Sequence, residues 1–342
     1  MKHILGVIAV IAAITLAAWV WLGRSFDQLL PLRASEESFF VDRLLGMQFY
    51  VIAFLFALII GFMLYSIFVF RRKPGDDSDG DYFHGNTTLE IMWTVVPLGV
   101  VLYFAVVGAG YLGDITAPES NELVVQVTGS QWNWRFDYPR FGISSPELNL
   151  PKGQQTVLEI SSIDVIHSFW VPEFRLKQDA VPGMVHPLRI TPTEVGTYVV
   201  RCAEICGKDH SYMLANVNVM EQNAFEAWVR AQVAPPSGGL AEAGAKIAKL
   251  NGCLGCHSVD GSTITGPTWL DLFGEEVQLA DGSTVVADEA YIMNSILNPG
   301  EQIVAGFDTV AMPANFGAVL SEDDLEALVA YIASLSTHDS TE

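Results

Sequence analysis

Three long apolar stretches dominate the first 112 residues, and shorter apolar runs alternate with polar residues in the remainder of the chain. Residues 4–22 are nineteen residues without a charge, and Met47–Phe70 are twenty-four. A third stretch covers about Met92–Leu112. At 1.5 Å per residue, helices of this length can cross a bilayer core of about 30 Å. The pattern therefore predicts a transmembrane hairpin within residues 24–113, whereas a soluble hairpin buried in a core is rarely so long and free of charge.

The first apolar stretch has two interpretations. It follows Lys2 and His3 as the core of a signal peptide does, but its nineteen residues exceed the usual length of such a core. It has no clear small-x-small cleavage site, and Trp19 and Trp21 precede Arg24 as interfacial aromatic residues would. Residues 1–23 are thus either a signal peptide or an additional transmembrane helix, and we favour the helix.

Basic residues predict the orientation in the membrane. Arg71, Arg72 and Lys73 follow the second stretch directly. Positively charged loops face the inside, so this connection is inside and both far ends of the hairpin are outside. Everything after about Asp114 is then expected on the exterior.

From Glu122 to about Met220 the chain changes to short β-branched runs with turn residues between them. Such spacing predicts a β-sandwich or barrel. The four clearest runs are 123–128, 156–160, 197–202 and 215–219. We therefore expect an all-β domain over residues 114–234.

Helical patterns surround a Pro/Gly/Ser-rich boundary after this domain. Asn223–Gln232 is a short amphipathic pattern, and the mixed composition that follows predicts a linker at 235–240. Helical patterns at 241–250 and 321–335 indicate an all-α domain over residues 241–342. Acidic residues occupy the first turn of the second pattern, after a capping serine.

Charge excludes one class of partner. The 342 residues hold 18 basic and 39 acidic side chains, a formal charge of −21. Residues 238–342 alone hold two lysines, no arginine and sixteen acids. Nucleic acid is bound through basic surfaces, so no nucleic-acid partner is expected. This surface would steer a basic protein toward the last domain, or serve only for solubility.

The stretch Cys202–Met213, C-A-E-I-C-G-K-D-H-S-Y-M, concentrates metal-binding side chains. Two thiols lie four residues apart, followed by an imidazole and a thioether, and a second imidazole, His167, lies thirty-five positions before the first thiol. This soft donor set suits copper better than a hard cation. A mononuclear blue copper site uses one cysteine, so the second thiol suggests two coppers bridged by two thiolates.

Three simpler interpretations remain for the same residues. Cys202 and Cys206 could form a disulfide, since they are expected outside the cytoplasm. They could join His210 in a structural zinc site. Finally, His210 and Met213 could be ordinary loop and core residues.

The pattern Cys-x-Glu-x-Cys-x-x-x-His-x-x-Met, with D-V-I-H-S-F at 164–169 and L-K-Q-D-A-V-P-G at 176–183, resembles subunit II of haem–copper cytochrome c oxidases. The resemblance implies a binuclear CuA centre in a cupredoxin domain. The ligands it implies are His167, Cys202, Cys206, His210, Met213 and the backbone carbonyl of Glu204. It also implies that the Glu204 carboxylate holds a magnesium ion shared with subunit I.

Two further roles follow from this resemblance. The run Q-W-N-W at 131–134 is similar to the family's aromatic run, which implies that Trp132 receives electrons for CuA. Without the resemblance, core packing is the simplest explanation of that run. The segment 84–97 resembles the start of the second hairpin helix, where Glu90 would lie at the mouth of a proton-uptake channel. A charge that stabilises the helix start is the alternative.

Residues 253–257, C-L-G-C-H, match the signature of covalent c-type haem attachment. Cys253 and Cys256 would bind the haem and His257 its iron, whereas a bare C-x-x-C could be redox-active or half a zinc site. With Gly266-Pro267 and T-V-A-M-P, residues 240–336 resemble a class I cytochrome c. The resemblance implies that Met312 is the sixth ligand and that the Pro267 carbonyl orients His257, with Met293 as the rival ligand.

The chain as a whole thus resembles subunit II of an oxidase with a fused cytochrome c, a multi-domain protein of membrane helices, an all-β cupredoxin and an all-α cytochrome c. The resemblance implies electron transfer from an external donor through haem c and CuA to subunit I of a proton-pumping oxidase in a prokaryotic plasma membrane, with subunit III as a further partner. The donor could be a cytochrome c, a copper protein or a bc1-type complex. Two alternatives are subunit II of a CuA-containing nitric oxide reductase and a membrane-tethered electron carrier.

Overall fold

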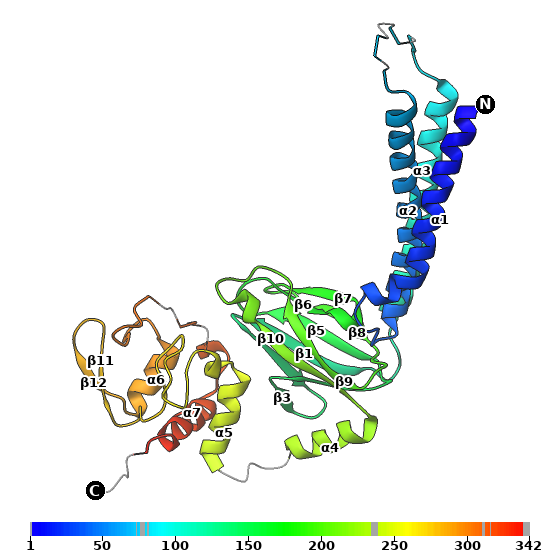
Figure 1. The fold of residues 1–342 in the computed structure, drawn as a ribbon. Helices are drawn as coiled ribbons and strands as arrows, with labels where there is room; N and C mark the ends of the chain where they lie inside the picture. Colours follow the sequence, from blue (N-terminus) through cyan, green and yellow to red (C-terminus); the bar gives the residue numbers. More distant parts are fainter. Residues whose placement is uncertain are drawn as a thin grey trace. The chain divides into compact units, whose positions relative to one another are not determined.

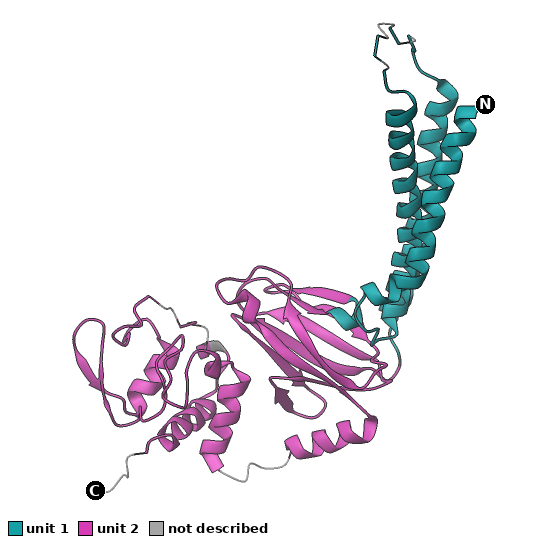
Figure 2. Cartoon of the chain, in the orientation of Figure 1, with its two compact units in different colours: residues 1–119, 172–175 teal, residues 120–171, 176–342 magenta. Residues whose placement is uncertain are grey.

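A computed structural model describes residues 2–72, 74–75, 79–80, 82–233, 239–309, 312–314 and 316–337. The chain forms two compact units (Figure 2). The first contains residues 1–119 and 172–175, and the second contains residues 120–171 and 176–342. Lys73, residues 235–238 of the predicted linker and the last five residues lie outside the described part of the chain.

The first unit is built on three long helices (Figure 1). These are α1 (Lys2–Leu29), α2 (Glu37–Val69) and α3 (Thr87–Thr116), each long and apolar enough to cross a membrane. The predicted hairpin is confirmed as a pair of helices, although α2 begins ten residues before its apolar stretch. Its first turns carry Asp42, which forms an ion pair with Arg175 at 2.7 Å. The ion pair with Arg175 thus stabilises the charged first turns of α2, and a hydropathy pattern does not reveal such a contact.

Two five-stranded sheets make up the β domain of the second unit. One sheet holds, in order, β3 (Ile143–Ser145), β2 (Asn133–Tyr138), β1 (Leu123–Ser130), β5 (Thr156–Ser162) and β8 (His186–Ile190). The other holds β4 (Leu148–Pro151), β10 (Leu214–Met220), β9 (Gly196–Cys202), β6 (His167–Val171) and β7 (Leu176–Ala180). The four strands predicted most clearly from the sequence are β1, β5, β9 and β10. The sandwich is the architecture expected of a cupredoxin.

Alternation along the strands explains the core of the sandwich. Side chains of β1 alternate between buried and exposed or half-buried positions, as expected when one face of a strand packs against the opposite sheet. Large side chains of other strands, among them Trp134, Phe136, Leu158 and Phe169, are fully buried. Helix α4 (Gln222–Val233) follows β10 and packs Trp228 against Tyr138. This rigid core carries the loops that hold the candidate ligands.

The α domain begins with α5 (Gly239–Leu250), two residues before its predicted boundary. It continues through the short helix η3 (Cys253–Gly255), the hairpin β11 (Glu276–Gln278) and β12 (Thr284–Val286), α6 (Glu289–Leu297), η4 (Phe316–Ala318) and α7 (Glu322–Ser334). Helices α5 and α7 cross where Gly244 meets the backbone of Ala327. A Cβ on Gly244 would lie 1.9 Å from the Ala327 carbonyl oxygen, so only glycine permits this crossing.

The C-terminal helix has the cap that the sequence predicts. The side chain of Ser321 accepts a hydrogen bond from the backbone of Asp324, and the Asp324 carboxylate in turn accepts one from the backbone of Ser321. This reciprocal capping box satisfies two of the free N–H groups at the helix start. The apolar face of α7 then packs into the core of the α domain, to which Leu328 and Ile332 contribute.

Candidate functional site

The candidate metal ligands come from two adjacent strands and the loop that follows one of them. His167 is the first residue of β6, and Cys202 is the last residue of β9. The two strands pair so that Phe169 lies opposite Cys202. This register brings the His167 Nδ1 to 3.9 Å from the Cys202 Sγ, although the two residues are thirty-five positions apart.

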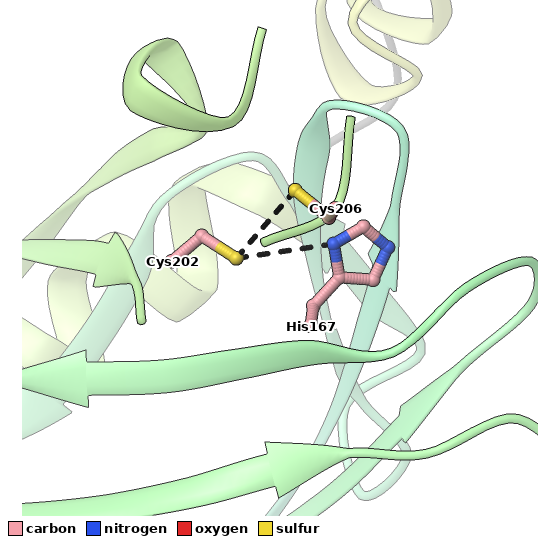
Figure 3. A group of neighbouring side chains, drawn as sticks. All are labelled: His167, Cys202 and Cys206. Atoms are coloured by element: carbon pink, nitrogen blue, oxygen red, sulfur yellow. Dashed lines mark hydrogen bonds between the residues drawn. The ribbon is translucent and has the colours of Figure 1, made fainter. Parts of the chain in front are cut away.

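The loop after β9 returns the second thiol to the first, and Figure 3 shows Cys202 facing both Cys206 and the ring of His167. Cys206 Sγ lies 3.7 Å from Cys202 Sγ, and these atoms and a His167 ring nitrogen all lie within 4.8 Å of one another. The short helix η2 (His210–Tyr212) closes the loop and directs His210 Nδ1 to 3.5 Å from Cys206 Sγ. The side chains thus converge on one small volume at the end of the sandwich.

Two weaker donors complete the group. Met213 is fully buried, and its Sδ lies 3.9 Å from Cys206 Sγ. The backbone carbonyl of Glu204 accepts a hydrogen bond from the Cys202 thiol at 3.2 Å, so this oxygen faces the thiols while the side chain of Glu204 is exposed. All six donors expected from the sequence therefore lie together.

The geometry separates the simpler interpretations. A disulfide requires sulfur atoms about 2.05 Å apart, whereas Cys202 and Cys206 are free thiols 3.7 Å apart. Structural zinc takes four ligands from cysteine, histidine and carboxylates, and a buried thioether lies outside that set. A group of two thiols, two imidazoles, a thioether and a peptide carbonyl fits a soft metal such as copper. His210 and Met213 are not isolated loop and core residues, because both contact Cys206.

An acidic residue orients the buried histidine. The Asp164 Oδ1 lies 2.8 Å from Nε2 of His167, which leaves Nδ1 facing the thiols. Burial alone lowers the pKa of His167, but the hydrogen bond to Asp164 and the neighbouring Cys202 thiolate raise it to about 9. Burial alone would raise the pKa of Asp164, but hydrogen bonds from His167 and from the Gln131 and Val165 backbone hold it below its usual value.

The two thiols differ in acidity. Burial opposes ionisation of Cys202, but hydrogen bonds from His167 and from the backbone lower its pKa to about 6. Burial and then the Cys202 thiolate raise the pKa of Cys206 to about 12. Without a cation, only one of the thiols ionises near neutral pH, because two negative charges at this distance repel each other. A positively charged metal would allow both thiolates to exist together.

The two tryptophans of the Q-W-N-W run have different surroundings. Trp134 is fully buried and packs edge-on against His167 and Phe169, so the core-packing interpretation holds for this residue. Trp132 is half-buried in the turn between β1 and β2, and its indole N–H donates to the carbonyl of Cys206 at 3.2 Å. Trp132 thus touches the loop that carries the thiols and remains partly open to solvent.

The C-x-x-C-H segment forms a second candidate site in the α domain. Helix α5 ends at Leu250, and η3 contains Cys253, whereas Cys256 follows it; both thiols are free. His257 Nδ1 lies 2.8 Å from the carbonyl oxygen of Pro267. Burial lowers the pKa of His257 more than this hydrogen bond raises it, which favours the neutral imidazole. With its Nδ1–H donated to Pro267, the lone pair on Nε2 is available to a haem iron.

Contacts of two further residues with His257 were not predicted from the sequence. Trp269 stacks on His257, with ring centroids 5.1 Å apart at 19°. Gly266 allows the Pro267 loop to approach, because a Cβ there would lie 2.9 Å from the His257 Cε1. The sequence showed the Gly-Pro pair but not that its glycine contacts the imidazole.

Met312 and Met293 are both half-buried against the core of the α domain. Met293 lies on α6, as its helical pattern predicted. The packing therefore does not separate the two methionines, and iron ligation by Met312 stays a prediction.

Glu90 lies in the first turn of α3 and has a local partner. Its Oε1 accepts a hydrogen bond from the backbone N–H of Asn86 at 3.2 Å, and the Asn86 side chain accepts one from the Leu89 N–H. These bonds cap the start of the helix, as the alternative to a proton-uptake role predicted. The proton-uptake role of Glu90 and magnesium binding by Glu204 stay predictions.

Three sequence families match separate parts of the chain. The transmembrane domain of cytochrome c oxidase subunit II matches residues 25–108, and its periplasmic domain matches residues 144–220. The cytochrome c family matches residues 241–336. The three matches follow one another in the order of the membrane helices, the β-sandwich and the α domain.

Two relatives cover most of the chain, and one solved structure covers a third of it. Cytochrome c oxidase subunit 2 of Alkalihalophilus pseudofirmus is 36% identical over 277 residues, which are 78% of this chain and 78% of that protein. The protein of the same name from Thermostichus vulcanus is 34% identical over 263 residues, covering 61% of this chain and 80% of that protein. The crystal structure of the periplasmic domain of subunit II of cytochrome oxidase of Bradyrhizobium japonicum is 28% identical, covers 33% of this chain and 95% of that one, and has a TM-score of 0.32.

Proposed function

The chain belongs to the family of cytochrome c oxidase subunit II, here with an additional cytochrome c domain, and we propose that electrons enter a terminal respiratory oxidase through it. In this proposal the chain would carry electrons from an external donor to subunit I. A haem c held by Cys253, Cys256 and His257 and a CuA centre held around Cys202 and Cys206 would supply the one-electron exchange along that route. Subunit I reduces oxygen to water and pumps protons. The observation that carries the proposal is the convergence of two thiols, two imidazoles and a thioether at the end of the sandwich.

The family implies a CuA copper centre, and the donor group described above fits it. We assign its ligands to His167, Cys202, Cys206, His210, Met213 and the backbone carbonyl of Glu204. When bound, the copper pair supplies one-electron exchange. The chain contributes rigidity: the ligands are fixed by paired strands and by hydrogen bonds such as that between His167 and Asp164. Ligands that move little keep the cost of reorganisation low when an electron arrives.

The cytochrome c domain implies a haem, and the C-x-x-C-H segment fits covalent attachment. We assign thioether bonds to Cys253 and Cys256, the proximal iron ligand to His257 and the sixth ligand to Met312. Ligation by histidine and methionine raises the reduction potential of a haem. The hydrogen bond between His257 and the Pro267 carbonyl holds the imidazole in the tautomer that leaves Nε2 free.

Partners and location extend the same proposal. The family's catalytic subunit is the partner that receives the electrons, and we propose subunit III as a further partner. The basic residues Arg71 and Arg72 favour an inside location for the loop between α2 and α3, which would direct both cofactor domains to the exterior of a prokaryotic plasma membrane. Magnesium held by Glu204 and proton uptake near Glu90 belong to this proposal as well.

Purified complexes test the proposed function. The oxidase assignment predicts that the chain copurifies with a haem–copper subunit and that the complex consumes oxygen, while the chain alone does not. Consumption of nitric oxide instead of oxygen would favour the reductase alternative, and purification of the chain as a single subunit would favour the tethered carrier. Because Glu90 also caps α3, its presence does not distinguish the oxidase from the reductase.

A further inference from the structure

Gln131, beside Trp132 in the turn between β1 and β2, forms a hydrogen bond with the loop that carries Cys206. Its side-chain Nε2 donates to the carbonyl oxygen of Cys206 at 2.6 Å. The same oxygen accepts the indole N–H of Trp132 at 3.2 Å. A peptide carbonyl has two lone pairs, so these two donors use its full hydrogen-bonding capacity.

The backbone of Gln131 is tied to the other group of ligands. Its N–H donates to Asp164 Oδ2 at 2.7 Å, and the Asp164 Oδ1 lies 2.8 Å from Nε2 of His167. One residue is therefore linked to Cys206 through its side chain and to His167 through its backbone. His167 lies on β6 and Cys206 in the loop after β9. The pairing of β6 with β9 reaches only as far as Cys202, so it does not itself fix the position of Cys206.

Gly207 shows how closely the loop and the turn approach each other. It has a φ of +124°, and a Cβ added to it would lie 2.9 Å from the Gln131 Nε2 and 3.0 Å from the Trp132 Cζ2. Glycine is the residue that tolerates both this backbone conformation and this contact. The position of Cys206 is thus fixed by packing of the turn as well as by its hydrogen bonds.

We propose that Gln131 is a positioning residue for the copper centre, which rests on the function proposed above. By holding the Cys206 carbonyl, the amide fixes the direction of the Cys206 side chain and its distance from Cys202 and His167. Loss of the amide donor would leave the Cys206 carbonyl with the Trp132 indole as its donor, and would loosen the loop without removing any ligand. Partners that orient metal ligands in this way affect affinity by roughly 10–100-fold.

Gln131→Glu is the direct test, because it keeps the length of the side chain but replaces both N–H donors with oxygen. In the complex purified from membranes, we expect the copper affinity, measured by competition with a chelator, to be roughly 10–100-fold weaker than in the wild type. We also expect a shifted near-infrared absorbance band, since the distance between the thiolates changes. Gln131→Met removes the donor without adding a charge and should act in the same direction.

Gln154→Glu is the matched control. Gln154 also donates from Nε2 to a backbone carbonyl, that of Asn121 at 2.9 Å. Gln154 precedes the first residue of β5, Thr156, whereas Asp164 follows the last, Ser162. The two ends of this strand are about 20 Å apart. Copper retention and the spectrum should match the wild type in this variant.

The outcomes are distinct. If Gln131→Glu and Gln131→Met retain copper and spectrum as Gln154→Glu does, the positioning role is wrong. If the wild type binds no copper, the function proposed above fails instead. Should Gln131→Glu fail to assemble, Gln131→Met decides, because an unchanged spectrum there would also overturn the inference.

A separate observation concerns α1, most of which precedes residues 25–108, the part of the chain that the transmembrane family matches. It packs against α2 through small residues facing large ones. A Cβ on Gly61 would lie 2.6 Å from Ile11 Cγ1, and one on Gly6 would lie 2.8 Å from the Tyr65 hydroxyl. Near the other end of α1, a Cβ on Gly46 of α2 would lie 3.6 Å from the Phe26 ring. Later residues of α1 thus contact earlier residues of α2, which means that the two helices are antiparallel.

Polar contacts accompany this antiparallel packing. The indole N–H of Trp19 donates to the Tyr50 carbonyl at 2.9 Å, and His3 Nδ1 lies 3.0 Å from the Tyr65 hydroxyl. The segment after α1 is also fixed, because Arg175 donates to the Pro31 carbonyl at 2.6 Å. In membranes, helix association depends on such close packing of small residues and on interhelical hydrogen bonds.

We infer that α1 remains in the mature protein as a third transmembrane helix packed on α2, in place of a cleaved signal peptide. Mass spectrometry of the chain in the purified complex tests this directly. We expect peptides from residues 2–24 in the same amount as peptides from the β domain. A mature chain that begins after residue 22 would overturn the inference.

Discussion

The indole N–H of Trp132 donates to the carbonyl oxygen of Cys206 at 3.2 Å. This contact joins a half-buried aromatic ring to the backbone of a proposed copper ligand through a single hydrogen bond. Trp134, two residues later, is fully buried in the core and is not open to a donor. The structure thus separates two tryptophans that the sequence presents as one aromatic cluster.

Replacement of Trp132 by alanine should slow electron transfer from haem to copper while both cofactors remain bound. We expect a decrease of at least about tenfold, which corresponds to about 1.4 kcal/mol in activation free energy. Flash-induced reduction of the haem, followed by copper absorbance, measures this rate. Copper and haem content serve as the control, and an unchanged rate would exclude Trp132 from the route.

Asp164→Asn should weaken copper binding by roughly 10–100-fold, because the carboxylate that fixes the His167 ring is replaced by a neutral amide. Competition with a copper chelator measures the affinity. Asp137→Asn is the control, since Asp137 accepts a hydrogen bond from Arg135 at 3.0 Å within β2. Equal copper affinity in the two variants would contradict the role assigned to Asp164.

The two methionines of the α domain can be separated by parallel substitutions. Met312→Ala should lower the potential of the haem and remove the spectral features of methionine ligation, because the iron loses its sixth ligand. Met293→Ala should change neither the potential nor the spectrum, since Met293 is part of α6 and is expected not to reach the iron. Redox titration followed by visible absorbance distinguishes them, and the reverse pattern would make Met293 the ligand.

Gly244→Ala should destabilise the α domain. The new methyl group would lie 1.9 Å from the Ala327 carbonyl oxygen, so α5 and α7 would have to separate. Overpacking of this kind costs about 1–3 kcal/mol, and thermal unfolding followed at the haem absorbance measures the loss. Gly300→Ala, where an added Cβ meets nothing within 4 Å, should leave the unfolding temperature nearly unchanged. Similar unfolding temperatures for the two variants would show that the crossing is not so tight.

The sequence predicted the elements whose signals are local. The charge-free stretch at Met47–Phe70 predicted a membrane helix, alternation predicted β1, and the motif spacing located the thiols of both candidate sites. The helix-like surroundings of Met293 were also predicted. Each of these signals depends on residues close to one another in the chain.

The remaining features depend on residues that fold together from distant positions. Gln131 reaches Cys206 across seventy-five residues, and Arg175 reaches Asp42 across 133, so no local pattern shows either contact. The early start of α2 escaped prediction for the same reason, because its charged first turns are stabilised by that arginine. Whether Met312 or Met293 is the sixth ligand depends on which sulfur atom lies near the iron, and the spacing of residues in the sequence does not give that position.

The account depends most on the identity of the metal beside Cys202 and Cys206. Metal and haem analysis of the purified complex, combined with its visible and near-infrared spectrum, tests this directly. We predict that the chain contributes two coppers and one covalent haem, with a near-infrared band that disappears on reduction. Zinc in place of copper, or a disulfide between Cys202 and Cys206 in the mass spectrum, would contradict the proposed electron-transfer function.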